Sequence, residues 1–210
     1  MNKYFSYCLS FVFCLLLSSP VFAAKKPSKK DMLVTIATPQ GEMKLILFAE
    51  TPQHRKNFLK LAKEGFYNNT TFHRVINDFM IQGGDANSKD DNPNNDGAGD
   101  IGYRIPAEIL PHLRHVRGAL AAARNNNPQK QSSGSQFYIV QNHQGVPHLD
   151  NNYTVFGQVI AGLDVIDKIA ESPTGPMDRP TTPIPMTVKL EKMKKKKITK
   201  LYGYQYPAAA

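Results

Sequence analysis

Apolar and polar side chains alternate in short runs along most of the chain, which is typical of strands with one buried face. Two such runs, residues 33–38 and 43–48, flank Pro39-Gln-Gly41 and predict a hairpin. Further strands are predicted at residues 71–75, 79–82, 118–122, 137–140, 154–159 and 186–190. Glycine-, asparagine- and proline-rich loops lie between them.

Helical spacing of apolar residues occurs in two places. Thr51-Pro52 predicts a helix start, and Gly65 supplies a stop after about three turns. A second short helix is predicted over residues 163–171, where apolar positions share one face. Many strands with only two helices favour a mainly β antiparallel barrel over alternating strand–helix layers.

The first 24 residues carry one lysine, a short apolar run and then small residues. This pattern predicts a secretory signal peptide, residues 1–23, cut after Ala23. An uncleaved membrane anchor is the alternative. Both cysteines, Cys8 and Cys14, fall inside the segment, so the mature chain is expected to have no thiol. We expect a basic stub at 24–31, one domain at 32–193, a basic tail at 194–210, and a periplasmic or secreted location.

The net charge of +9 is concentrated at the ends of the chain. Residues 31–188 hold 14 Lys/Arg against 16 Asp/Glu, whereas residues 189–200 hold seven lysines and one glutamate. The lysine tail predicts either a solvated strand edge or a weak contact with polyanions or an anionic membrane surface. Beyond Tyr202 we expect a disordered or loosely packed end.

Several short motifs do not fit the chemistry that they suggest. Residues 97–102 match G-x-G-x-x-G but lack the preceding strand and following helix that bind phosphate. An Asn/Asp-rich loop from Asn92 has Tyr103 where a calcium loop needs glutamate. His112 and His115 have no third metal ligand and are predicted to be surface residues. No metal and no cofactor are expected.

Arg74 stands among large apolar residues in TFHRVINDFMIQGGD, residues 71–85. Strand alternation predicts Phe72, Arg74 and Ile76 on one face and His73 and Val75 on the other. Arginine cannot release its proton, so it acts as a charged donor. An apolar recess with one cation suits rotation about an Xaa-Pro amide, which breaks no bond. A structural arginine at a barrel rim is the alternative reading of the same residues.

The stretches TFHRVINDFMIQGGD, GAGDIGYRIPAE, GALAAAR, SGSQFYI and HLDNNYTVFGQVIAGLDVIDKI resemble, in order and spacing, the cyclophilin peptidyl-prolyl isomerases. The resemblance covers about residues 32–192. Within the family, the sequence is most similar to the exported bacterial branch. It implies a closed eight-stranded antiparallel barrel capped by two helices.

The same resemblance implies roles for individual residues. Arg74 would be the catalytic cation, and Gln82 the amide that orients it. The other positions would bind substrate: the proline pocket (Phe79, Met80, Tyr138, Leu149), the strip for the residue before proline (Ala123 and the main chain of Arg124), the neighbouring subsite (Gln136, Gly97), and the periphery (His73, His148, Tyr153).

Some positions depart from the common family pattern. Tyr138 replaces the usual phenylalanine, and His148 replaces the tryptophan of cyclosporin-sensitive members, which predicts weak binding of that drug. Arg124 and Tyr153 replace the asparagine and histidine of eukaryotic relatives. The Asn/Asp-rich segment 88–96 has no functional interpretation.

The predicted function is peptidyl-prolyl isomerisation during the folding of exported proteins, by a monomer acting on proline-containing peptides and unfolded chains. A proline-peptide binding or chaperone module with a docking lysine tail is the alternative.

Overall fold

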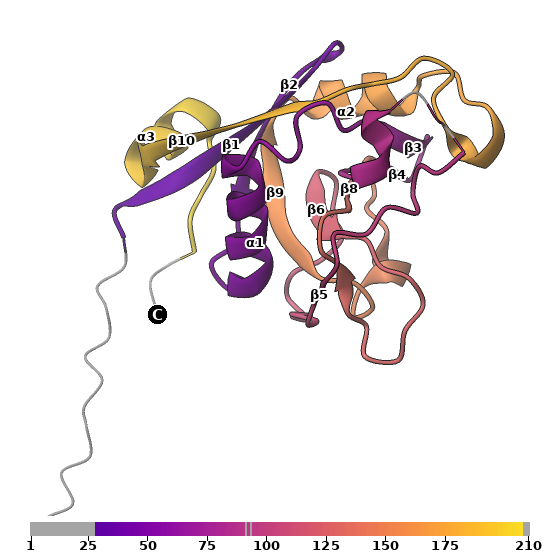
Figure 1. Cartoon of the computed structure of the whole chain (residues 1–210). Coiled ribbons are helices and arrows are strands. Elements are labelled where there is room, and N and C mark those ends of the chain that lie inside the picture. The colour runs from indigo at the N-terminus through magenta and orange to yellow at the C-terminus, as the bar shows by residue number, and fades with distance from the viewer. Residues whose placement is uncertain (1–27, 91, 93, 208–210) are drawn as a thin grey trace, which may run out of the picture.

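One curled antiparallel sheet forms the body of the protein in the computed structural model, which describes residues 28–90, 92 and 94–207 (Figure 1). Its strand order is β10-β1-β2-β9-β6-β8-β4-β3. The strands are β1 (Lys30–Thr38), β2 (Gly41–Leu47), β3 (Phe72–Ile76), β4 (Met80–Gly83), β6 (Ala119–Ala122), β8 (Phe137–Val140), β9 (Val155–Ala161) and β10 (Thr187–Lys194). A separate pair joins β5 (Arg104–Ile105) to β7 (Ser132–Ser133). The predicted signal peptide lies outside the described residues.

The expectation of a closed barrel is wrong, because the sheet is an open half-barrel with β10 and β3 as its edges. The segments that precede these two strands do meet, through an isolated bridge between Thr71 and Pro185. Phe72 N–H donates to Ile184 O at 2.9 Å beside it. Met186 N–H donates to Thr70 O and Asn69 N–H donates to Met186 O, both at 2.9 Å. The gap between the edges is therefore crossed by a short main-chain contact and not by continuous pairing of β10 with β3.

Three α-helices pack on the sheet: α1 (Pro52–Lys63), α2 (Leu163–Ala170) and α3 (Lys195–Tyr202). The first two were predicted. Helix α1 has proline in its first turn, and Gly65, just after its end, adopts a left-handed φ of +73°. Short 3₁₀ turns are η1 (Ala86–Lys89), η2 (Pro147–Leu149) and η3 (Pro176–Asp178). Within the described ranges, no helix has the length and apolar character needed to cross a membrane.

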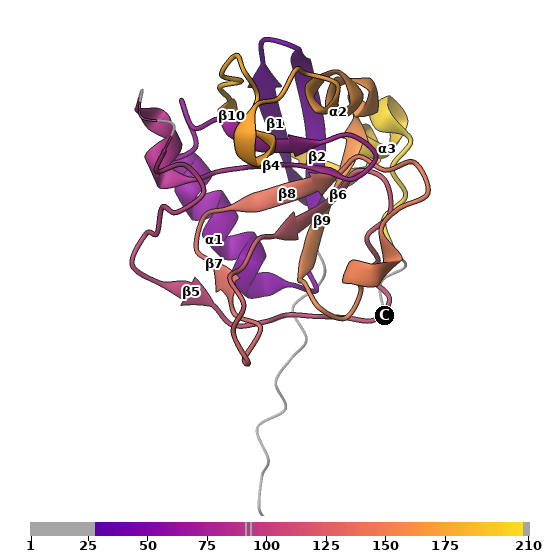
Figure 2. The same cartoon turned by 90° about the vertical axis from the view of Figure 1, so that its right-hand side faces the viewer.

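The main core lies inside the curl, between the sheet and helices α1 and α2 (Figure 2). Successive residues of β8 show the two-residue period of a strand: Phe137 and Ile139 belong to this core, whereas Tyr138 and Val140 pack on the outer face. Strand β3 departs from simple alternation, since its register shifts between Phe72 and Arg74. Phe72 therefore joins the inner core. The prediction that Phe72 shares a face with Arg74 is wrong.

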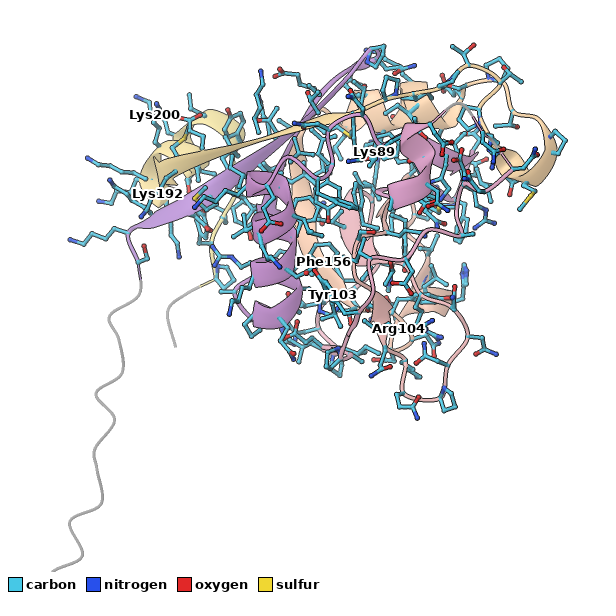
Figure 3. All side chains as sticks on the ribbon, viewed as in Figure 1. Lys89, Tyr103, Arg104, Phe156, Lys192 and Lys200 are labelled. Atoms are coloured by element: carbon cyan, nitrogen blue, oxygen red, sulfur yellow. The ribbon has the colours of Figure 1, made fainter. Side chains whose placement is uncertain are left out.

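The lysine-rich C-terminus is folded into the end of β10 and helix α3. Helix α3 buries Ile198 completely against an outer-face cluster that includes Leu33, Ile46 and Met193. Tyr204 and Tyr206, beyond the helix, pack on the same cluster with ring centroids 4.8 Å apart. Lys192 and Lys200 project from this end of the molecule in Figure 3, on the opposite side of the view from Arg104. One buried isoleucine and two tyrosines thus anchor a segment whose composition is dominated by lysine.

Candidate active site

A pocket of about 140 Å³ opens on the outer face of the sheet, where β3, β4, β6 and β8 lie side by side. Nine of the residues predicted for the site line it: Arg74, Phe79, Met80, Gln82, Ala123, Arg124, Tyr138, Leu149 and Tyr153. They come from the three strands β3, β4 and β8, from the turn between β3 and β4, from the segment just after β6, and from the segment around η2. Six of these nine residues are apolar or aromatic and three are polar or charged, so the structure brings apolar side chains together with the guanidinium of Arg74.

Arg74 lies opposite Gln82 in the β3–β4 pairing, with 42% of its side chain exposed. Its Nε donates a hydrogen bond to Asp178 Oδ2 at 3.2 Å. Arg74 is therefore neither buried nor sealed in an ion pair away from the pocket, and its charge is available there. The sequence analysis missed Asp178, which is 104 positions away and has no local pattern that marks it.

The hydroxyl of Tyr138 is hydrogen-bonded within the protein, so it is not a free polar group in the pocket. It lies 2.9 Å from Nε2 of His115, whose Nδ1 is 2.8 Å from Asp150 Oδ1. Asp150 accepts the Nδ1 proton, which leaves Nε2 as the acceptor for the tyrosine O–H. Burial lowers the pKa of His115 despite the opposing effect of Asp150, in keeping with a neutral ring. Tyr138 thus offers its ring to the pocket, as a phenylalanine would.

The prediction that His115 lies on the surface beside His112 is wrong, because His115 is only 2% exposed. Burial also raises the pKa of Tyr138. The buried carboxylate of Asp150 has a lowered pKa, since hydrogen bonds from His115 and Arg114 outweigh the effect of its burial. The His115–Asp150 contact joins two loops distant in sequence, and spacing alone does not reveal it.

Arg124 covers one side of the pocket with its side chain and exposes its main chain. The guanidinium lies 4.6 Å from the ring centroid of Tyr153, and Nε donates to Asn152 O at 3.1 Å. Both main-chain groups of Ala123 are used within the protein, by Gln136 and Ser133. Across the described part of the chain, the N–H and C=O of Arg124 take part in no hydrogen bond. These two groups can pair with an extended peptide.

A second pocket of about 420 Å³ adjoins the first and shares Gln82, Ala123 and Arg124 with it. Gln82 Nε2 donates to Gln136 Oε1 at 3.1 Å, and Gln136 Nε2 donates to Gly97 O at 3.1 Å. Gln136 and Gly97 therefore border the neighbouring pocket, as predicted. The amide of Gln82 turns toward Gln136, so no hydrogen bond with Arg74 is found among the described residues. The predicted orienting contact of Gln82 is absent in this arrangement.

His73 and His148 do not line the proline-sized pocket. His73 is 5% exposed and faces a different cleft of about 740 Å³, beside Asp96 and Arg179. Burial lowers its pKa to about 4, so the ring is neutral at pH 7. His148 stacks on Phe79 with ring centroids 5.8 Å apart and supports the pocket wall from behind. His73 thus lies apart from the pocket that Arg74 lines, because adjacent side chains of a strand point to opposite faces.

No cluster of three or more potential metal ligands occurs in residues 28–90, 92 and 94–207. His112, one of the two histidines considered for metal binding, pairs with Glu50 at 2.7 Å. The other, His115, belongs to the network beneath Tyr138.

Comparison with known proteins agrees with this geometry. The family model described as cyclophilin type peptidyl-prolyl cis-trans isomerase/CLD matches residues 33–190. Peptidyl-prolyl cis-trans isomerase CYP18-1 of Arabidopsis thaliana is 42% identical over 158 residues, covering 73% of this chain and 91% of the relative. Peptidyl-prolyl cis-trans isomerase-like 2 of Rhizopus delemar is 41% identical over 162 residues, or 74% of this chain, but the match spans only 28% of that longer relative.

A solved structure shows the same fold. The cyclophilin type peptidyl-prolyl cis-trans isomerase of Cryptosporidium parvum has a TM-score of 0.67 and 32% identity, covering 77% of this chain and 98% of that chain. The same protein was also crystallised in the presence of the dipeptide Ala-Pro, with a TM-score of 0.66. With the family match spanning most of the chain, this protein belongs to the cyclophilin-type peptidyl-prolyl cis-trans isomerases.

Proposed function

We propose that the chain accelerates rotation about Xaa-Pro bonds in exported proteins, with Arg74 supplying the charge that stabilises the twisted amide. One observation carries the proposal: a half-exposed guanidinium lines a pocket of about 140 Å³ together with apolar and aromatic side chains. Phe79, Met80, Tyr138 and Leu149 form walls that suit the apolar face of a proline ring. No covalent step is required.

The chemistry follows from the electronic structure of the amide. Resonance gives the planar bond a rotational barrier of roughly 20 kcal/mol. When the bond twists, the prolyl nitrogen loses conjugation and regains a lone pair. A guanidinium N–H directed at that nitrogen binds the twisted state better than either planar isomer, and this difference is what accelerates the reaction.

The reduction in activation free energy that catalysis requires is larger than one hydrogen-bond donor supplies, so Arg74 does not act alone. An acceleration of about 10⁵ requires roughly 7 kcal/mol. One well-placed donor contributes about 3–4 kcal/mol. We assign the remainder to the pocket, which holds the ring, and to the unpaired main chain of Arg124, which holds the preceding residue. Arg74 then acts on a substrate whose position is already restricted.

The test is cis–trans exchange of a short Xaa-Pro peptide, followed by NMR in the presence of purified residues 24–210. Phe79→Ala should weaken peptide binding, because it removes a wall of the pocket. Phe66→Ala is the matched control, since Phe66 packs against Tyr67 on the inner core instead. Binding without exchange would favour the alternative of a proline-peptide binding module. An unchanged affinity in Phe79→Ala would contradict the assigned pocket.

We further propose that the chain is exported and acts in the periplasm or outside the cell, as a monomer. The support is the sequence of residues 1–23, which lie outside the described structure. Intact-mass measurement of the chain recovered from a periplasmic extract of a bacterial host should show Ala24 at its N-terminus. Recovery of uncut protein in the membrane fraction would favour the anchor instead.

A weak contact with anionic surfaces is a second proposal, and the folded C-terminus supports it. Helix α3 and β10 hold seven lysines against one acidic residue over positions 189–200. Lysines near an anionic bilayer contribute about 1 kcal/mol each. Binding to phosphatidylglycerol-containing vesicles should fall with salt and with the triple change Lys196→Gln, Lys197→Gln, Lys200→Gln.

The control for that experiment neutralises three lysines on another helix, Lys56→Gln, Lys60→Gln and Lys63→Gln on α1. An equal loss in both triple variants would show that only net charge matters. No vesicle binding by the parent protein would favour the simpler role of a charged edge that prevents aggregation.

A further inference from the structure

The contact between Arg74 and Asp178 concerns the residue on which the proposed function rests. Nε of Arg74 donates to Asp178 Oδ2 at 3.2 Å, and both side chains are partly exposed, at 42% and 46%. Through the described part of the chain, no other hydrogen bond to this guanidinium is found. Because Nε is the atom engaged, both terminal nitrogens of the fork keep their N–H groups available to a substrate.

Asp178 lies in a segment whose two arms are hydrogen-bonded to each other. An isolated bridge joins Thr174 to Pro180, and Gly175 N–H donates to Arg179 O at 2.8 Å. Thr181 N–H donates to Pro173 O, also at 2.8 Å, one step farther from the tip. Prolines at both ends of this ribbon restrict its backbone further. Segment 173–181 is thus a constrained ribbon with η3 and Asp178 at its tip.

The tip is held in an unfavourable backbone conformation. Met177 and Asp178 both have left-handed φ angles, 63° and 58°, although neither is glycine. Left-handed φ at two successive residues is the pattern of a type I′ turn, and Arg179 N–H donates to Pro176 O at 3.4 Å across it. Aspartate tolerates this region, whereas methionine disfavours it. Met177 is 79% exposed, so burial of its side chain does not compensate. Strain of this kind persists where neighbouring structure enforces it, and it is concentrated at functional sites.

We propose that Asp178 is a positioning residue for Arg74: the Asp178 carboxylate holds the guanidinium by Nε and so directs its terminal N–H groups at the prolyl nitrogen. An arginine side chain has many rotamers, and a preorganised fork loses less freedom when it forms its transition-state hydrogen bond. The contact takes the place that Gln82 was expected to fill, since the Gln82 amide is engaged by Gln136. This proposal rests on Arg74 being the catalytic residue.

The carboxylate of Asp178 also lowers the positive potential around Arg74. This effect opposes catalysis, because it weakens the attraction of the guanidinium for the prolyl nitrogen. Its influence is limited because both groups are solvated, and solvent screens charges at this exposure. Orientation does not weaken with screening in the same way, since the bond from Nε fixes the plane of the fork. We therefore expect removal of Asp178 to slow the reaction and not to accelerate it.

The experiment compares Asp178→Ala with Asp178→Asn in the purified mature chain, using NMR exchange of an Xaa-Pro peptide. Asp178→Ala should lower the exchange rate constant at saturating peptide about tenfold, in the range expected for a misplaced catalytic group. Peptide affinity should stay within about twofold, because the apolar walls are untouched. Asp178→Asn keeps an oxygen acceptor in the same place and should recover most of the rate. The melting temperature should not change, because the pair is exposed.

Two further measurements separate positioning from a general structural effect. Asp164→Ala removes another carboxylate from an ion pair, the more exposed i,i+4 partner of Lys168, and should leave the rate unchanged. The double variant Arg74→Ala/Asp178→Ala should be no slower than Arg74→Ala alone, because Asp178 acts only through Arg74. In the parent protein, the Nε–H resonance of Arg74 should be shifted and should move toward that of a free arginine in Asp178→Ala.

The outcomes distinguish this proposal from the proposed function. An inactive parent protein, or full activity in Arg74→Ala, would overturn the function and this inference together. An active, Arg74-dependent parent with an unchanged or faster Asp178→Ala variant would overturn the positioning role alone. Additive losses in the double variant would do the same.

Discussion

The outer face of the sheet carries apolar side chains at both of its ends, but only one end is covered by a helix. Toward the β10 edge, Leu33, Ile46 and Met193 are sealed by α3, whose Ile198 is fully buried. Toward the β3 edge, Met80 and Tyr138 belong to a second outer cluster that remains open as the pocket. Apolar surface that a helix covers adds stability, whereas surface left concave and uncovered can bind a ligand. The difference arises from what the chain lays over each end.

This comparison predicts a separation of effects, since changes at the β3 end should alter turnover and changes at the β10 end should alter stability. The largest effect is expected at Arg74. Arg74→Ala should lower the exchange rate by about 10²–10³, or about 3–4 kcal/mol of transition-state stabilisation. The free energy of unfolding should hardly change, because the side chain is 42% exposed.

Exchange NMR and urea denaturation on the same samples check both parts of that prediction. Arg74→Lys is the informative companion, because lysine keeps the charge but not the planar fork, and it should restore little activity. Retained exchange in Arg74→Ala would place the rate-enhancing group elsewhere in the pocket.

The next effect concerns the covered end. Ile198→Ala should lower the free energy of unfolding by about 3 kcal/mol, since it opens a cavity beneath α3. Exchange activity per folded molecule should be unaffected. Leu201→Ala on the same helix is the control, because Leu201 is 54% exposed and its loss should change stability by less than about 0.5 kcal/mol. A loss of turnover in fully folded Ile198→Ala would show that the two ends are coupled.

A smaller effect should come from the other side of the β3 edge, where His73 is buried next to Arg74 in the chain. Burial lowers its pKa to about 4 in the folded protein, from the usual 6.5. Between these values the unfolded chain binds the proton more readily, so stability is lost as pH falls. From pH 7 to pH 5 the contribution of His73 should be a loss of about 2 kcal/mol.

Urea denaturation at several pH values measures this loss, and His73→Gln should flatten the curve relative to the parent. His54 and His115 also have pKa values lowered chiefly by burial, so the flattening should be partial. Parallel curves for parent and variant would mean that His73 is solvated in solution.

The smallest effect is expected at Tyr138. Tyr138→Phe removes the hydroxyl that donates to His115 and should destabilise the fold by about 1 kcal/mol. Exchange activity should remain within about twofold, because the aromatic wall is kept. A large change in turnover measured at full folding would mean that the hydroxyl reaches the substrate.

Local patterns were sufficient for most of the secondary structure. Alternation in residues 33–48 and 137–140 predicts strands that the structure contains, and the Thr51-Pro52 start and Gly65 stop predict α1. The resemblance to the family identified the residues that line the pocket, among them Phe79, Met80 and Leu149. Each of these inferences depends on neighbours in the sequence or on motifs with constant spacing.

Where the sequence analysis failed, the deciding contacts are distant along the chain. Helix α3 has only one fully buried apolar residue, Ile198, so its lysines suggest a solvated tail until β1 and β2 supply a surface beneath it. The two edges of the sheet meet only in a short main-chain contact between residues 69–72 and 184–186, which are far apart in the sequence. His115 was predicted to be a surface histidine, but in the folded protein Tyr138 and Asp150 enclose it.

The amino-acid sequence by itself determined the strands, the first two helices, the separation of basic ends from a mildly acidic body, and the presence of a lone arginine on an apolar strand. The physical reason is that periodicity and charge are properties of adjacent residues. Only the tertiary structure decided which outer surface is covered, that His115 is buried beneath Tyr138, and that Asp178 meets Arg74 from 104 positions away. Those outcomes depend on the path of the chain, because they arise when distant segments compete for the same space.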